Sequence, residues 1–512
     1  MNNIKRLVRN LTSVSKNQKY WFGYYMEHKK IDKNTVLFEC FHGRSMEGNP
    51  LILVQEMAKD YPERFIYYCT TRDKEKHNRR ISENGFEITM VHIASRKYVR
   101  LLATAGYIIS NASLPNFYIR REEQVYLQTW HGVPLKSLGK SMRHGVESMS
   151  NVQHNFLQAS HIMFPNDYTR GIIMRDYGLE QLYGGKVIMS GYPSNHIFLD
   201  KEAGEALKRQ LGLENKRVYA YMPTWRGSSN QNIDVDNYIN ELKNILKVLD
   251  RGMKCDQRLF INFHPIFGGE IDYSDYEHIM SFPPDVHTYA FLNSADALIT
   301  DYSSVMFDFS LTEKPVILFT YDYDRYIEER GMYLDIKELP FIRISDVCEL
   351  AEHIAQDSLM VENYTESELY KNLYKYDTKD GAERVIKLLV EGDASAADEI
   401  DCSSNLDKRI KAHIPNRQPL ASDLDKIAGI ASDENDVVVL YKKWFGRGLS
   451  EALYDNYRYA FNYVITVKET PRTYLQQVKC KIGSKRARND IAAKELNRML
   501  PGFDVEIEDM HL

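Results

Sequence analysis

The sequence predicts an α/β protein with two doubly wound domains facing a cleft and a smaller module after them. Three observations predict this class: the length of 512 residues, a composition of 43% apolar and 27% charged residues, and a regular alternation of short apolar runs with amphipathic stretches. At roughly 150 residues per domain, the length corresponds to about three to four domains. Strand patterns that alternate with helix patterns are typical of βαβ units around a mostly parallel sheet.

The first series of alternating patterns begins at residue 35 and defines a domain over residues 35–197. Its β-branched and aromatic runs predict strands, and its periodic stretches predict helices. The expected strands are 35–38, 65–70, 88–93, 107–110, 125–130, 162–165 and 187–191, and the expected helices are 50–58 and 97–105.

A second series follows and defines a domain over residues 198–392. The expected strands are 218–221, 259–263, 286–289, 297–300 and 316–320, and the expected helices are 201–210, 238–249 and 381–390. Small and acidic residues at 391–398 read as a linker. Residues 393–512 contain strand patterns at 437–441 and 463–467, which indicate a small α/β or α+β module of unknown role.

Charge and cysteine usage exclude several classes. With 66 Lys and Arg against 71 Asp and Glu, the net charge of -5 gives no overall attraction to nucleic acid, and no nucleic-acid partner is expected. No C-x-x-C pair occurs among the six cysteines, a pattern typical of reduced thiols in the cytoplasm. We find neither a secretion-type leader nor an apolar stretch of the roughly 18–20 residues that a membrane span requires.

Residues 1–34 form a basic segment rich in aromatic residues. Its cations are interleaved with Tyr20, Trp21, Phe22, Tyr24 and Tyr25. Apolar residues within it recur at helical spacing, at Ile4, Leu7, Val8 and Leu11. This pattern fits a helix on an anionic membrane surface, and it fits equally a helix that packs on the first domain.

The most informative short motif follows the expected strand 297–300. Here an apolar strand enters a polar turn that opens a helix, where backbone N–H groups can hold a phosphate or pyrophosphate. The hydroxyls of Thr300, Ser303 and Ser304 add donors. The alternative is an ordinary helix cap made by Asp301 or Ser303.

Two histidines occupy equivalent places in the two series. His131 follows the strand 125–130 and precedes Gly132 and Pro134, so the chain turns there. His264 follows the strand 259–263 and precedes a proline. A histidine near neutral pKa can take a proton from an attacking hydroxyl, and a second can stabilise phosphate charge. The alternative for each is a structural histidine.

Other chemistries lack their motifs. The sequence contains no P-loop, no G-x-G-x-x-G after a strand, no H-E-x-x-H and no G-x-S-x-G. No carboxylate cluster suggests a dedicated metal site, and no metal or cofactor is expected.

An ordered set of motifs across residues 36–391 strongly resembles the CDP-glycerol:poly(glycerophosphate) glycerophosphotransferases of teichoic-acid synthesis. No single motif is specific, whereas the ordered combination is. The motifs are Phe38-Glu39-Cys40-Phe41-His42-Gly43 with Asn49-Pro50, Gln128-Thr129-Trp130-His131-Gly132-Val133-Pro134-Leu135-Lys136, Gly191-Tyr192-Pro193, Met222-Pro223-Thr224-Trp225-Arg226, His264-Pro265, Thr300-Asp301-Tyr302-Ser303-Ser304 and Arg330-Gly331-Met332-Tyr333.

The resemblance implies a GT-B fold with an acceptor-side first domain and a CDP-glycerol-binding second domain. It implies transfer of glycerol phosphate to a hydroxyl of a lipid-linked glycan or growing poly(glycerol phosphate), with release of CMP. His131 is then the general base and His264 binds and polarises the donor phosphates. The other implied donor or phosphate contacts are Thr224, Arg226, Thr300, Asp301, Ser303, Ser304 and Arg330, and the acceptor-side residues are Trp130, Gly132 and Lys136.

The resemblance also favours peripheral attachment to the inner face of the membrane, where the lipid-linked acceptor lies. It leaves open a CDP-ribitol donor, a capsule polymer as product, a homo-oligomer, and the choice between primase and polymerase. A nucleotide-sugar glycosyltransferase and a catalytically silent scaffold are less favoured. Two places depart from the family pattern, Asn262-Phe263 before His264 and Ser194-Asn195-His196 after Pro193.

Overall fold

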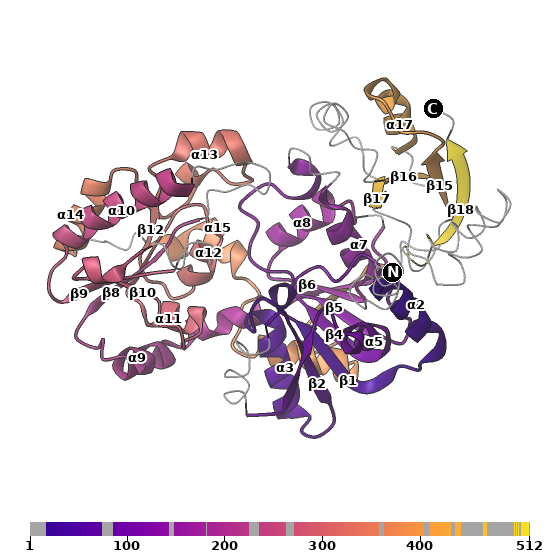
Figure 1. Cartoon of the computed structure of the whole chain (residues 1–512), viewed down its shortest axis with the longest axis horizontal. Helices are drawn as coiled ribbons and strands as arrows, with labels where there is room; N and C mark the ends of the chain where they lie inside the picture. Colours follow the sequence, from indigo (N-terminus) through magenta and orange to yellow (C-terminus); the bar gives the residue numbers. More distant parts are fainter. Residues whose placement is uncertain are drawn as a thin grey trace, which may run out of the picture. The chain divides into compact units, whose positions relative to one another are not determined.

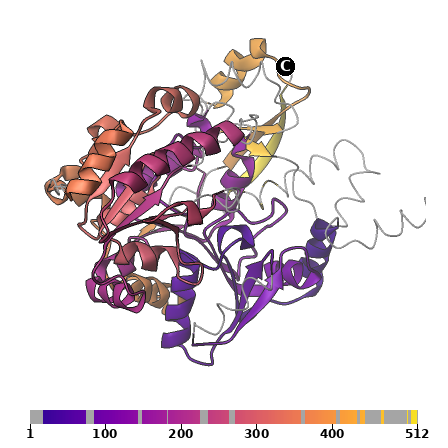
Figure 2. The ribbon, with the colours of Figure 1, turned by 60° about the vertical axis from the view of Figure 1, so that its left-hand side comes forward.

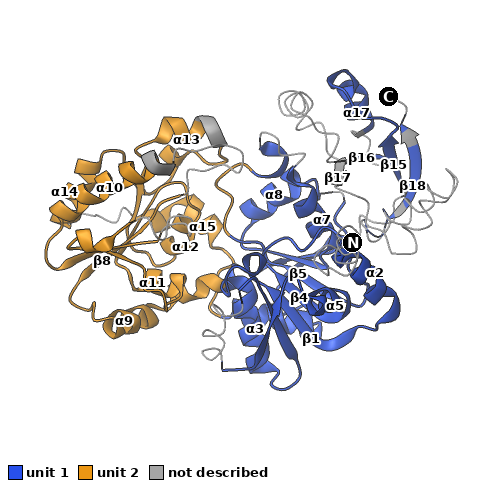
Figure 3. Cartoon of the chain, viewed as in Figure 1, with its two compact units in different colours: residues 1–131, 138–193, 380–512 blue, residues 132–137, 194–379 orange. Residues whose placement is uncertain are grey.

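The computed structural model describes residues 17–73, 85–142, 148–180, 182–224, 235–262, 271–357, 363–403, 409–431, 436–441, 464–467, 496, 498, 500 and 503–510 (Figure 1). The chain forms two compact units, shown in Figure 3. Unit 1 comprises residues 1–131, 138–193 and 380–512, and unit 2 comprises residues 132–137 and 194–379. The described strands form three sheets of eight, six and four strands.

Unit 1 contains the eight-stranded sheet, ordered β14-β7-β6-β5-β4-β1-β2-β3. All its strands pair in parallel except β14, which runs antiparallel to β7. The strand order reverses between β1 and β4, and the carboxyl ends of the strands at such a reversal are where doubly wound sheets bind ligands. The strands are β1 (Asp32–Glu39), β2 (Ile66–Thr71), β3 (Ile88–His92), β4 (Ala105–Ser110), β5 (Val125–Gln128), β6 (His161–Phe164), β7 (Lys186–Met189) and β14 (Asp398–Asp401).

Helices supply the apolar layers of unit 1. The buried stripes of α3 and α16 pack together on one face of the sheet, where Leu53 and Ile386 join the same core as Phe38. The other described helices of this unit also bury part of their surface. The helices are α2 (Gln18–His28), α3 (Asn49–Asp60), α5 (Arg96–Thr104), α7 (Ser150–Gln158), α8 (Asp167–Asp176), α16 (Gly381–Glu391) and α17 (Leu424–Ala431).

Unit 2 contains the six-stranded sheet, which is parallel throughout and ordered β10-β9-β8-β11-β12-β13. Its order reverses between β8 and β11, so unit 2 repeats the topology of unit 1. The strands are β8 (Arg217–Met222), β9 (Gln257–Ile261), β10 (Ile279–Ser281), β11 (Ala297–Thr300), β12 (Val316–Phe319) and β13 (Ile342–Ile344).

Helices lie on both faces of the unit 2 sheet (Figures 1 and 2). The helices α10 and α14 cover one face, and α9 and α11 cover the other (Figure 1). The helices are α9 (Lys201–Gln210), α10 (Val235–Gly252), α11 (Thr288–Ser294), α12 (Val305–Ser310), α13 (Tyr323–Arg330), α14 (Val347–Gln356) and α15 (Glu368–Leu373). The predicted α/β class with two doubly wound sheets is thus confirmed.

The last module contains the four-stranded sheet, ordered β17-β16-β15-β18 and parallel throughout. Its strands are β15 (Arg409–Pro415), β16 (Asp436–Tyr441), β17 (Val464–Val467) and β18 (Asp504–Met510). A parallel sheet requires crossover connections, so the described part of this module is α/β in character. The predicted strands 437–441 and 463–467 correspond to β16 and β17.

Three details differ from the predictions. The expected strand 286–289 is wrong, because the Val286 N–H bonds to the Pro283 carbonyl in a turn and Thr288 begins α11. The strands β10 and β13 have only three residues each, too few for a readable pattern. Helix α16, which we expected in the second domain, belongs to unit 1, because its apolar face completes the core beside α3.

The described part of the N-terminal segment is helix α2, since residues 1–16 with Ile4, Leu7, Val8 and Leu11 lie outside the described residues. Phe22 and Tyr25 are buried, and the Phe22 ring contacts the ring of Phe117. Helix α2 therefore packs on unit 1, as one of the two predicted alternatives requires. Among the described residues, we find no helix with the length and apolarity to cross a bilayer.

Candidate active site

In unit 1, the loops after β1 and β4 meet at the point where the strand order reverses. The backbone N–H of Phe41, after β1, donates to Oδ1 of Asn111, after β4, over 2.8 Å. The Asn111 N–H in turn reaches the Glu39 carbonyl at 3.4 Å. These bonds connect the two chain segments at the point where parallel α/β sheets bind their ligands.

His131 lies three residues beyond β5 and contacts the segment after β4 at Asn111. Its Nδ1 is 2.6 Å from the backbone carbonyl oxygen of Asn111. A carbonyl oxygen only accepts, so Nδ1 carries the proton, and in the neutral ring Nε2 keeps a free lone pair. Desolvation by the surrounding protein disfavours the charged ring and so lowers the pKa of His131, although the hydrogen bond to the Asn111 carbonyl opposes this shift. The tautomer and the lowered pKa together leave Nε2 of His131 unprotonated and able to accept a proton.

Trp130 fixes the plane of the His131 ring. The two rings stack with their centroids 4.6 Å apart, and Trp130 is itself buried against Phe156 and Tyr177. Its backbone lies in the left-handed region, with φ of 51°, which is unusual for a bulky residue. Such conformations persist where the surroundings enforce them and are concentrated at functional sites. We assign Trp130 to positioning the base.

No role was predicted from the sequence for Glu39, a buried carboxylate at the end of β1. The Tyr98 hydroxyl donates to this carboxylate over 3.1 Å. Burial raises the pKa of Glu39 to about 7, while Tyr98, Thr70 and Arg72 oppose the shift. His42 follows, with Nδ1 4.0 Å from Glu39 Oε1. The sequence contained a signal for these two residues, a glutamate at the end of an apolar strand and a histidine three residues after it.

In unit 2 the turn after β11 is tied to the end of β8. The Asp301 carboxylate accepts from the backbone N–H of Thr224 at 2.9 and 3.1 Å and from its neighbour Tyr302 at 2.6 Å. Asp301 is buried. It holds the two strand ends together where the sheet order reverses.

Thr300 differs from its predicted role. Its side chain is fully buried, and its hydroxyl donates to the Met222 carbonyl over 2.7 Å. The hydroxyl is thus used within the sheet and does not point to a ligand. Ser303 and Ser304, which directly precede α12, are only partly buried and are better placed as phosphate donors.

Gly132 brings a second segment against this turn. Its φ is +81°, and a Cβ atom there would lie 2.8 Å from Ser304 Oγ, so a side chain is excluded. The segment continues along unit 2, where the Tyr333 N–H donates to the Leu135 carbonyl over 2.9 Å. Lys136 Nζ lies 5.7 Å from the centre of the Tyr326 ring. Gly132 and Lys136, expected on the acceptor side, therefore belong to unit 2, because the chain changes unit directly after His131.

Three predicted residues cannot be placed. His264 and Arg226 lie outside the described residues. The backbone of Arg330 ends α13, and its side chain lies outside the described part of the structure.

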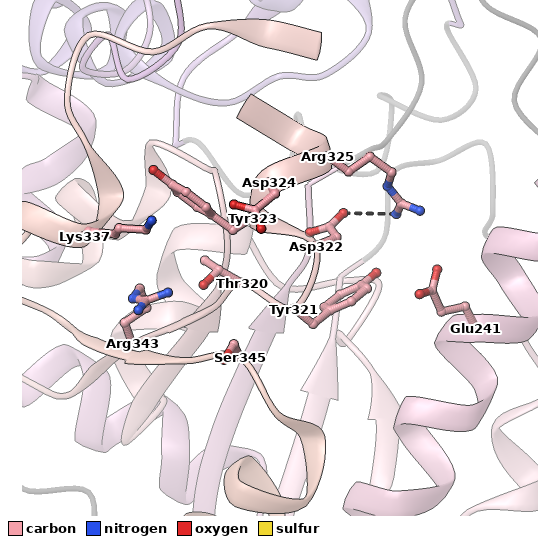
Figure 4. A pocket seen from close by; sticks show the side chains of 10 residues that line it. All are labelled: Glu241, Thr320, Tyr321, Asp322, Tyr323, Asp324, Arg325, Lys337, Arg343 and Ser345. Atoms are coloured by element: carbon pink, nitrogen blue, oxygen red, sulfur yellow. Dashed lines mark hydrogen bonds and ion pairs between the residues drawn. The ribbon is translucent and has the colours of Figure 1, made fainter. Parts of the chain in front are cut away.

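A cavity of about 530 Å³ opens beyond the carboxyl ends of β12 and β13 (Figure 4). The Tyr302 hydroxyl donates to Asp322 in its wall over 3.0 Å, so the cavity adjoins the turn after β11. In Figure 4, Lys337 and Arg343 lie on the side opposite Glu241. The lining residues are Glu241, Thr320, Tyr321, Asp322, Tyr323, Asp324, Arg325, Lys337, Arg343 and Ser345. The size is within the range of small-molecule sites.

The family model for CDP-glycerol:poly(glycerophosphate) glycerophosphotransferases matches residues 23–391, which is most of the chain. The chain belongs to this family. The family predicted from the motifs is thereby confirmed.

Among curated members of the glycerophosphotransferase family, a teichoic acid poly(glycerol phosphate) polymerase of Staphylococcus epidermidis is 29% identical over 352 residues, 65% of this chain and 47% of the relative. A teichoic acid glycerol-phosphate transferase of Staphylococcus aureus is 26% identical over 70% of this chain and 94% of its own length. A poly(ribitol-phosphate) polymerase of Bacillus spizizenii is 25% identical over 70% of this chain and 56% of its own length. The chain thus spans about half the length of these two polymerases and nearly the whole length of the Staphylococcus aureus transferase.

The solved structures agree with this family fold. The wall teichoic acid polymerase TagF, in a histidine-to-asparagine variant soaked with CDPG, matches 76% of this chain and 97% of the TagF chain at 24% identity, with a TM-score of 0.62. This likeness confirms the predicted GT-B-like fold class.

Proposed function

We propose that the protein transfers glycerol phosphate from CDP-glycerol to a hydroxyl of a lipid-linked acceptor in the synthesis of teichoic acid or a related surface polymer, releasing CMP. The observation that carries this proposal is the bond between His131 Nδ1 and the Asn111 carbonyl, which leaves Nε2 as a base at the loops after β1 and β4. Family membership supplies the donor class.

The proposed reaction uses few groups. His131 Nε2 takes the proton of the acceptor hydroxyl, and the oxygen attacks the phosphorus next to glycerol. The bond between that phosphorus and the bridging oxygen breaks, and CMP leaves with the bridging oxygen and its electron pair. Phosphoryl transfer of this kind depends mainly on positioning and on stabilisation of phosphate charge.

Unit 2 is the proposed donor side. The turn at Ser303 and Ser304 would hold the pyrophosphate, while Asp301 and Thr300 keep this turn in place through their bonds to Thr224 and Met222. The adjoining cavity has the size for a small nucleotide. Its lining contains the cations Arg325, Lys337 and Arg343, which can bind phosphate, and the carboxylates Glu241, Asp322 and Asp324. His264, Arg226 and Arg330 remain proposed donor contacts.

The test is CMP release from CDP-glycerol with a lipid-linked acceptor analogue, with product length measured on the same samples. The His131→Ala variant should lose about 10²–10⁴-fold in turnover while retaining its circular dichroism spectrum. A folded His131→Ala variant with full turnover would remove the assigned base. Absence of CMP release from the wild-type protein with every acceptor would remove the proposed function itself.

A second donor has support from the relatives, since poly(ribitol-phosphate) polymerases also match this chain. Parallel assays with CDP-glycerol and CDP-ribitol decide between the two polyols. Faster CMP release from CDP-ribitol at equal concentration would reassign the donor and leave the chemistry unchanged.

We further propose that the protein works at the cytoplasmic face of the membrane, held there by its basic N-terminal part. A cavity of about 360 Å³ is lined by Lys29, Lys30, Lys97 and Arg100, with Asp32 as its acidic residue. Next to it, Tyr24 of α2 is 43% exposed. Exposed cations with amphipathic aromatic rings suit an anionic membrane surface, at about 1 kcal/mol per cation.

Vesicle co-sedimentation tests this attachment. Removal of residues 2–16, and separately the double change Lys29→Gln with Lys30→Gln, should reduce binding to anionic vesicles. The matched control, Lys247→Gln with Lys254→Gln, removes two exposed cations from unit 2. Equal binding of all variants would contradict the proposal. The deletion stops before α2 because Phe22 and Tyr25 belong to the core of unit 1.

A further inference from the structure

Two arginines and a histidine gather beside the proposed base without a part in the reaction as described. His42 and Arg44 lie in the loop after β1, and Arg72 directly follows β2. The Arg72 guanidinium donates from Nε to the His42 carbonyl over 2.9 Å, and its backbone N–H donates to the Gly43 carbonyl over 2.8 Å. We call His42, Arg44 and Arg72 the cationic loop cluster.

The backbone of this cluster is built into a fixed and unusual shape. Phe41 and His42 both have left-handed φ angles, 47° and 57°. Gly43 also has a left-handed φ, and a Cβ atom there would lie 3.2 Å from the Thr71 backbone and 3.3 Å from the Arg72 nitrogen. Only glycine allows the loop to approach Arg72 this closely. Non-glycine residues in such conformations indicate a position that the surrounding structure enforces.

The cluster lies next to the base. The Phe41 ring meets the His131 ring edge to face, with 5.7 Å between centroids. Burial first, and then the charges of Arg44, Arg72 and His131, lower the pKa of His42, so the four side chains share one electrostatic environment. The carboxylate of the buried Glu39 lies 4.0 Å from Nδ1 of His42.

The guanidinium groups of Arg44 and Arg72 are exposed. Glu39 is buried and its pKa is raised to about 7, so it carries only part of a negative charge at neutral pH. Glu47 and Asp73 are further carboxylates in the two loops that carry these arginines. The Arg72 guanidinium is held by its bond to the His42 carbonyl, and exposed guanidinium groups bind phosphate oxygens through paired N–H donors.

We propose that the cationic loop cluster binds the phosphodiester that adjoins the attacking hydroxyl of the acceptor. This inference rests on the proposed function, because it names the substrate part that must lie beside His131. In a glycerol phosphate chain, one glycerol separates the terminal hydroxyl from the preceding phosphodiester. An acceptor whose hydroxyl reaches His131 Nε2 therefore brings its own phosphate to the loop next to that ring.

The test compares two acceptor analogues with the same lipid and the same terminal glycerol. One carries a phosphodiester next to this glycerol, and the other carries a neutral linkage of equal length. Arg44→Gln should raise the KM for the phosphodiester acceptor about tenfold or more, as expected for loss of a charged phosphate contact. The KM for the neutral acceptor and the KM for CDP-glycerol should stay unchanged. Arg64→Gln, a change of an exposed arginine elsewhere in unit 1, is the matched control.

A binding measurement separates contact from turnover. A water-soluble glycerol phosphate oligomer should bind the His131→Ala variant more weakly when Arg44→Gln is added, with a smaller dependence on salt. Arg72 is changed to Lys, which keeps the charge but loses the Nε bond to the His42 carbonyl. This variant separates the contribution of the charge from that of the loop shape.

Three outcomes overturn the inference. One is an equal loss with both acceptors, and another is a raised KM for CDP-glycerol alone, which would assign the cluster to the donor phosphates. The third is unchanged oligomer binding. In each of these cases the wild-type protein still releases CMP, so the proposed function stands; failure of that function would appear as absence of CMP release from the wild type.

Discussion

At the scale of single residues, the hydrogen-bond partner of His131, rather than its place in the sequence, decides which ring nitrogen carries the proton. Any histidine at the end of a strand could serve as a donor or as an acceptor. The Asn111 carbonyl decides between these roles, because it can only take a hydrogen bond from Nδ1. The partner lies 20 residues away along the chain and is a backbone atom, so no side-chain pattern announces it.

The pH dependence of turnover follows from this arrangement. The base must be neutral, and the protein around it lowers the pKa of His131 below its ordinary value of 6.5. We expect kcat/KM to decline with falling pH, with its midpoint below pH 6.5 and a limiting slope of about tenfold per pH unit. Initial rates of CMP release in buffers of constant ionic strength measure this profile. A decline centred above pH 7 would contradict the assignment.

Glu39 affects stability in the opposite sense from an ordinary surface carboxylate. Burial raises its pKa from 4.5 to about 7, so between these values the folded protein holds a proton that the unfolded chain has lost. Stability therefore falls as the pH rises through this interval. The Glu39→Gln variant lacks this titration and should gain on the order of 2–4 kcal/mol in its free energy of unfolding relative to wild type between pH 4.5 and pH 8.

Urea unfolding at a series of pH values checks the prediction for Glu39. The exposed Glu214, changed to Gln, is the control and should show a difference that does not depend on pH. A constant difference between Glu39→Gln and wild type would mean that Glu39 is already ionised in the folded protein at low pH.

At the scale of elements, the turn after β11 depends on bonds between neighbouring strands. Asp301 accepts from two N–H groups, that of Thr224, shared between both carboxylate oxygens, and that of Tyr302, and hydrogen bonds to a charged group are worth more than neutral ones. Asp301→Ala should lower the free energy of unfolding by on the order of 2–4 kcal/mol and raise the KM for CDP-glycerol. Asp301→Asn keeps one acceptor oxygen and should recover part of both losses. Denaturant unfolding and initial rates on the same preparations give both quantities, and an Asp301→Ala protein as stable as wild type would contradict the role.

Helix α16 shows that the pattern of a helix can predict the helix without predicting the unit to which it belongs. Its amphipathic pattern predicts the helix correctly, and its place in the chain suggests the second domain. Its buried residues Val385 and Ile386 instead join the core with Leu53 of α3, more than 300 residues earlier in the chain. An apolar stripe records that a helix is covered on one face and carries no information about which partner covers it.

At the scale of the whole molecule, two units with separate apolar cores share one chain. We expect two calorimetric transitions, since the two-state approximation suits single cores. CDP-glycerol should mainly stabilise unit 2 and so raise the temperature of its transition. At a concentration of 100 times its Kd, the free energy of unfolding of unit 2 should increase by about 2.7 kcal/mol. The Asp301→Ala variant should lower the same transition, which identifies it. A single transition that responds as a whole would contradict independent cores.

The sequence by itself determined the strand–helix alternation, most strand positions, the family and the place of His131 at a strand end. These properties follow from local periodicity and from short ordered motifs, which are written contiguously along the chain. The tertiary structure alone decided which His131 nitrogen carries the proton, that Thr300 is used within the sheet, that Gly132 and Lys136 belong to unit 2, and that His42, Arg44 and Arg72 form one cluster. Each of these depends on a contact between segments far apart in the chain, and such contacts form only when the sheets have brought the strand ends together.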